Sequence, residues 1–178
     1  MPLKRLLAEH KAAICKAWLE QSLAIYSDEY AKFAQTSGDP FANPVGAIFR
    51  EGLASVFDVL LDEADVERCR PALTPVVRVQ AVQDASPSQA LAFVPLLKSA
   101  VRESLADKLQ DAESQEALSA LDTRIDRLTL VAFDLYTECR EKIAELRVNE
   151  AKRSMARALV SRRQTCPTRP TPSEGKRP

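Results

Sequence analysis

Few side chains in this sequence have the chemistry of a metal ligand or a thiol nucleophile: one histidine, His10, and four cysteines, Cys15, Cys69, Cys139 and Cys166. The cysteines lie far apart and form no CxxC pair or Cys/His cluster of the kind that a zinc site needs. A haem globin needs a proximal ligand on a late helix, usually histidine, and no histidine follows residue 10. We therefore expect no metal and no cofactor.

Catalytic chemistry has little support elsewhere in the sequence. There is no phosphate-binding loop, no nucleophile elbow and no paired catalytic motif, and the acidic residues fall where solvated helix faces need charge. His10 is open to two interpretations, a ligand or general base and a half-buried partner on an amphipathic helix face, of which the second is favoured. The sequence predicts a protein that is not an enzyme.

One polar cluster surrounds a clear helix start in the middle of the chain. Ser86, Pro87 and Gln89 match a capping box, in which the serine oxygen accepts the amide of the third helical residue and that residue's side chain reaches back. The side chains of this cluster could line a ligand pocket or a docking patch, or they could be ordinary capping and surface polarity; they are Arg78, Gln80, Gln83, Ser86, Gln89 and Lys98.

The elements that would position these residues are all predicted to be helices. The chain has 178 residues and four glycines, none between residues 53 and 174. Strands joined by tight turns need more glycines than this. Asn43 followed by Pro44 predicts a helix start. Gly52 in that helix allows a close helix crossing or is simply tolerated. Residues 86–105 predict one helix that bends at Pro95.

The cleanest pattern in the chain predicts a long last helix over about residues 114–158, which we expect to project beyond the domain. Apolar residues recur there in steps of three and four, as in a heptad seam, and the seam continues after a shift of register. Such a seam packs in the domain core or in a dimer; it comprises Leu118, Leu121, Ile125, Leu128, Leu135, Ile143 and Leu146.

Charge is unevenly placed although the formal net charge of the whole chain is zero. Residues 151–178 hold eight basic side chains against one glutamate, a net charge of +7. Residues 161–178, with four prolines and no apolar periodicity, are predicted to be a disordered basic tail. The first residues carry charges throughout their apolar positions, and the cysteines are unpaired, so we expect no signal peptide and a cytoplasmic location.

Two stretches of the sequence resemble a known family. "DPFANPVGAIFREGLASVFDVLL" and "VRVQAVQDASPSQALAFVPLLKSAVRE" are similar to the RsbRD-type N-terminal domain, the sensory module of RsbR-like stressosome co-antagonists. The resemblance covers roughly residues 5–150 and implies a globin-like all-α domain over residues 1–150 without haem, usually dimeric, with its last helix leading toward an output domain. RsbR-like proteins continue into a STAS output domain with phosphorylated residues, and the resemblance does not extend to that domain or to those residues.

These observations lead to a functional hypothesis with two alternatives. The chain is expected to be a non-catalytic bacterial regulatory or sensory module, homodimeric through its long helix, with a protein partner. In the first alternative it is a globin-like sensor that binds a small ligand. In the second it docks on nucleic acid or a membrane surface through its basic tail, although the tail has no aromatic residue for stacking.

Overall fold

Helices make up the regular structure of the part of the chain that the computed structural model describes, residues 3–25, 43–83, 85–109 and 111–164, with no strand among them. This confirms the predicted all-α class. The α-helices are α1 (Leu3–Glu9), α2 (Lys11–Ala24), α4 (Pro44–Leu61), α5 (Arg70–Val82), α6 (Pro87–Leu91), α7 (Phe93–Ser104) and α8 (Ala112–Gln164); two short 3-10 helices span Val66–Cys69 and Ala106–Lys108.

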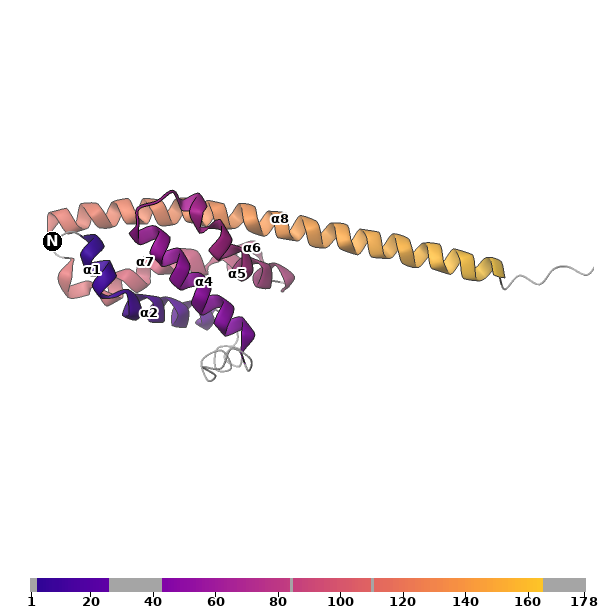
Figure 1. Cartoon of the computed structure of the whole chain (residues 1–178), viewed down its shortest axis with the longest axis horizontal. Coiled ribbons are helices and arrows are strands. Elements are labelled where there is room, and N and C mark those ends of the chain that lie inside the picture. The colour runs from indigo at the N-terminus through magenta and orange to yellow at the C-terminus, as the bar shows by residue number, and fades with distance from the viewer. Residues whose placement is uncertain (1–2, 26–42, 84, 110, 165–178) are drawn as a thin grey trace, which may run out of the picture. The chain divides into compact units, whose positions relative to one another are not determined.

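The chain divides into two units, residues 1–140 and 141–178. In the first unit the shorter helices gather against the early part of α8 (Figure 1). The second unit contains the remainder of α8. This helix extends beyond the predicted range of about 114–158, so residues 161–164, predicted as part of the tail, are helical. The rest of the predicted tail, residues 165–178, lies outside the described residues.

Two of the predicted helix starts are confirmed. The Asn43 side chain accepts a hydrogen bond from the amide of Gly46 at 2.8 Å, and Pro44 is the first residue of α4. At the start of α6, the amide of Gln89 donates to Ser86 Oγ and the amide of Ser86 donates to Gln89 Oε1 at 3.1 Å, which completes the capping box. Both caps satisfy backbone donors that a helix leaves without an acceptor.

The prediction of one bent helix over residues 86–105 is wrong, because α6 ends at Leu91 and α7 begins at Phe93. Pro95 is therefore the third residue of α7. In the first turn of a helix the backbone amide has no intrahelical acceptor, so a proline there loses no hydrogen bond. The interruption at Ala92 thus accommodates Pro95 at low cost.

The core of the first unit is centred on aromatic side chains from three helices. Trp18 of α2, Phe49 of α4 and Phe93 of α7 are fully buried. The rings of Phe49 and Phe93 meet edge to face, with centroids 5.9 Å apart. Trp18 donates its indole N–H to the backbone oxygen of Phe93 at 2.6 Å, which satisfies the one polar atom of that side chain.

Gly52 lies at a close crossing of α4 and α5, as the first of its two interpretations predicts. A Cβ atom built on Gly52 would come within 2.5 Å of Val76 Cγ2 and 3.1 Å of the backbone oxygen of Ala72. The first of these distances is far below a van der Waals contact. The two helices can therefore approach this closely only because residue 52 has no side chain.

We expect Gly52→Ala to destabilise the protein. Alanine is the better helix former by about 1 kcal/mol, but overpacking a filled core costs about 1–3 kcal/mol, and here the backbone of Ala72 cannot give way. Urea unfolding measures the difference. The double variant Gly52→Ala/Val76→Ala removes the closest clash, so its loss should be smaller than the sum of the two single losses; simple additivity would contradict the crossing.

Candidate functional site

The residues of the predicted polar cluster differ in their burial and in their partners. Ser86 and Gln89 are exposed and serve the capping box of α6. Arg78 is exposed, and Gln83 is half-buried where α5 ends. Gln80 is only 1% exposed, and its Oε1 atom has no hydrogen-bond partner. The capping interpretation therefore accounts for two of these residues, Ser86 and Gln89.

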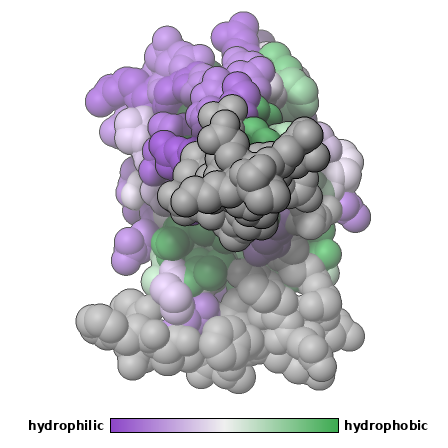
Figure 2. Space-filling view, turned by 90° about the vertical axis from the view of Figure 1, so that its right-hand side faces the viewer, coloured by the Kyte–Doolittle hydropathy of each residue, from purple (hydrophilic) through white to green (hydrophobic). Residues whose placement is uncertain are grey.

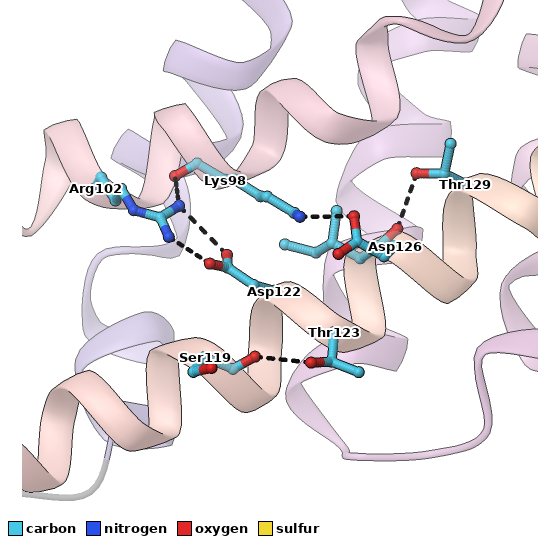
Figure 3. A network of polar contacts seen from close by, with 8 residues as sticks. Lys98, Arg102, Ser119, Asp122, Thr123, Asp126 and Thr129 are labelled. Atoms are coloured by element: carbon cyan, nitrogen blue, oxygen red, sulfur yellow. Dashed lines mark hydrogen bonds and ion pairs between the residues drawn. The ribbon is translucent and has the colours of Figure 1, made fainter.

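Lys98, the last residue of that cluster, belongs to a network of polar contacts between α7 and α8 (Figure 3). Its Nζ atom lies 2.6 Å from Asp126 Oδ1. One turn further along α7, the guanidinium of Arg102 pairs with the carboxylate of Asp122 and donates to the backbone oxygen of Lys98 at 3.2 Å. Two ion pairs, one turn apart on each helix, thus join α7 to α8.

Sequence reasoning missed this network, although a signal for it was present. Lys98 and Arg102 are four residues apart, and so are Asp122 and Asp126. Residues four apart lie on the same helix face, so a basic pair and an acidic pair with equal spacing can match along two neighbouring helices.

Side chains of α8 also bind the carboxyl ends of two other helices. Arg124 donates to the backbone oxygens of Leu60 at 2.7 Å and of Ala64 at 2.8 Å, where α4 ends. Arg140 donates to the backbone oxygen of Ala81 at 3.1 Å, near the end of α5. A helix leaves its last carbonyl groups without intrahelical donors and carries partial negative charge there. The two arginines supply donors and positive charge at these places.

The residues of the predicted seam have two different environments. Five of them are buried within the first unit, with exposed fractions between 0% and 7%, namely Leu118, Leu121, Ile125, Leu128 and Leu135. These five side chains form part of the core of a single chain. Ile143 is half-buried and Leu146 is 62% exposed.

A cavity of about 490 Å³ lies in the first unit between α1, the end of α4 and the first turns of α8. Its walls are mainly apolar and include Leu7, Leu60 and Leu121. Arg124 also lines it. Cavities of this size and composition are typical of small-molecule sites.

His10 has a hydrogen-bond partner at each ring nitrogen. Nδ1 lies 2.9 Å from the backbone oxygen of Leu6 and Nε2 lies 2.6 Å from Lys108 Nζ. Because a carbonyl can only accept, Nδ1 carries the proton and Nε2 accepts from the ammonium group. His10 lies between α1 and α2. This half-buried, satisfied histidine matches the second of its two interpretations.

The described cysteines differ in accessibility. Cys69 is fully buried, and burial raises the pKa of its thiol to about 11. Burial also raises the pKa of Cys15, whereas Cys139 is half-buried. Cys166 lies outside the described residues. Among the residues that the structure places, no three His, Cys, Asp or Glu side chains come together as metal ligands would.

The face drawn in Figure 2 shows both hydrophilic and apolar side chains. Large apolar side chains that are at least half exposed in the first unit include Val82, Leu130 and Phe133. Within the described part of the chain, no helix has the length and hydropathy needed to cross a lipid bilayer.

The sequence matches the family described as the RsbT co-antagonist protein rsbRD N-terminal domain over residues 12–151. The match covers most of the chain, and the chain belongs to this family, which confirms the resemblance noted in the sequence. The family is one of regulatory sensory domains related to the stressosome. No curated protein and no solved structure matches the chain.

We expect Cys69 to resist thiol reagents in the folded protein. A pKa of about 11 leaves about one thiolate in a thousand at pH 8, and the thiolate is the reactive form. Iodoacetamide labelling followed by peptide mass spectrometry should show slow modification of Cys69 in buffer and rapid modification in urea. Cys139 provides an internal comparison. Equal labelling of Cys69 in both conditions would contradict its burial.

The ion pair between Arg102 and Asp122 should contribute little net stability. Arg102 is 46% exposed and Asp122 is 21% exposed, and exposed pairs typically contribute at most about 1 kcal/mol. A double-mutant cycle of Arg102→Ala and Asp122→Ala, measured by urea unfolding, should give a coupling free energy below about 1 kcal/mol. A coupling above about 2 kcal/mol would mean that this pair holds α7 on α8.

Proposed function

We propose that this chain is a non-catalytic regulatory module that acts in the cytoplasm by binding other proteins, and that it forms a homodimer through the part of α8 after Arg140. Membership of a family of regulatory sensory domains supports the first statement. The second rests on one observation, a row of exposed apolar side chains in the second unit.

The exposed row follows an 11-residue repeat. Ala144 and Val148 recur 11 positions later as Met155 and Leu159. Three turns of an α-helix contain close to 11 residues, so these four positions fall on one face. Val148 is 51% exposed, Met155 69% and Leu159 64%. A single helix cannot bury such a row by itself, and a second copy of the same helix offers an identical apolar face.

This proposal moves the dimer contact away from the predicted seam. Leu118 to Leu135 are buried within their own chain, so these side chains are not available to a partner. The segment from 144 to 159 carries charges of both signs beside its apolar row, among them Glu145, Arg147 and Lys152. Mixed charges at the edges of an apolar row are typical of helix pairs that associate specifically.

We propose further that a signal acts by changing the packing of α7 on α8. Two observations support this mechanism. The interruption at Ala92 lets α7 change its angle to α6, and the two exposed ion pairs between α7 and α8 can break and form again as α7 moves. Binding of a partner or ligand that favours one packing over the other would then shift the populations of the two.

A charge in the apolar row should dissociate the dimer. Size-exclusion chromatography with light scattering at micromolar concentration should give a dimer for the wild type and a monomer for Val148→Glu/Met155→Glu. Leu146→Glu is the matched control: Leu146 is 62% exposed on the same helix, but two positions from Val148 and hence ~200° away around the axis. If Leu146→Glu dissociates the dimer equally well, the row is not the contact; if the wild type is a monomer, the proposed dimer is wrong.

A further inference from the structure

A second candidate feature lies within the first unit, in the cavity between α1, the end of α4 and the start of α8. Its volume is about 490 Å³, and the apolar part of its lining comes from all three helices, including Leu3, Leu7, Leu61 and Ala117. The buried leucines among them belong to the edge of the core. A cavity with such walls favours an apolar molecule of modest size.

The charged side chains around this cavity differ in their exposure. Lys4, Glu63 and Glu113 are exposed, so water screens their charges. Arg124 is half-buried. Its guanidinium donates to two neutral backbone oxygens, those of Leu60 and Ala64. Among the described residues it has no carboxylate within ion-pair distance.

Arg124 therefore has both charge and donors left to offer. A guanidinium carries five N–H donors, and the two carbonyl bonds use one donor on each of its terminal nitrogens. A carboxylate matches the planar donor fork of arginine better than other small groups do, and the charge assists each hydrogen bond. A ligand with one carboxylate would supply the ion-pair partner that Arg124 lacks among the described residues.

The position of Arg124 is fixed by the end of α4. Glu63 has a φ of 54°, in the left-handed region that non-glycine residues rarely adopt. Its amide donates to the backbone oxygen of Leu60 at 3.2 Å, and Arg124 binds the carbonyl groups of Leu60 and Ala64 on either side of it. The turn thus holds the guanidinium beside the apolar walls before any ligand arrives, which lowers the cost of binding.

We propose that this cavity binds a small carboxylate with an apolar body, whose carboxylate pairs with Arg124 and whose chain lies against the leucine side chains. The site does not depend on the proposed dimer, because its residues all lie in the first unit. No covalent step is involved.

Isothermal titration of the full chain with octanoate tests this site. We expect octanoate to bind at least tenfold more tightly than octanol or octylamine, which share its apolar chain but lack the carboxylate. Ala117→Leu, which narrows the cavity without changing Arg124, should weaken octanoate binding and leave the unfolding temperature unchanged or higher. Failure of octanoate to bind at millimolar concentration, or equal binding of octylamine, would overturn the proposal.

Arg124→Gln and Arg140→Gln form a matched pair. Each removes from α8 a guanidinium that donates to backbone oxygen at a helix end, two oxygens for Arg124 and one for Arg140, and only Arg124 lines the cavity. We expect Arg124→Gln to weaken octanoate binding at least tenfold and Arg140→Gln to leave it unchanged. Equal losses would mean that Arg124 acts only on stability. The monomeric variant Val148→Glu/Met155→Glu should bind octanoate like the wild type, so this test and that of the dimer can fail separately.

Discussion

The first unit depends on the burial of one face of α8. The seam residues from Leu118 to Leu135 are buried along about five turns of that helix. Their side chains form an apolar surface on which the shorter helices pack, and the hydrophobic effect stabilises this packing. Polar contacts then fix where each helix meets α8. Arg124 and Arg140 bind the ends of α4 and α5, and two ion pairs align α7. Apolar burial supplies most of the stability, and the polar contacts supply specificity.

Much of this arrangement could be predicted from the sequence because it rests on local signals. The scarcity of glycine and the apolar spacing indicated an all-α protein, and the starts of α4 and α6 follow from the chemistry of Asn43 and Ser86 with their prolines. The interruption at Ala92 could not be predicted, since alanine is a good helix former and Pro95 alone suggested a bend further along. Helix propensity does not show at which residue a helix is interrupted to accommodate a proline.

The candidate sites were harder to predict for a different reason. Periodicity shows which face of a helix is apolar, but it does not show whether that face meets its own domain or a second chain; burial answers this for Leu118 to Leu135. The role of Arg124 depends on backbone oxygens some 60 positions earlier in the chain. Every residue has a backbone oxygen, so the sequence does not show which of them an arginine will bind. The globin-like topology and the basic tail remain predictions.

The proposed account assigns different tasks to successive segments of one helix. Residues before Arg140 build the domain core and border the cavity with Arg124, and residues 144–159 present an apolar row to a partner. The most direct test of the central claim, association through that row, is the mass of the intact wild-type chain under native conditions. Native mass spectrometry should give a species of twice the 19.7 kDa of one chain. A single-chain mass at micromolar concentration would contradict the account.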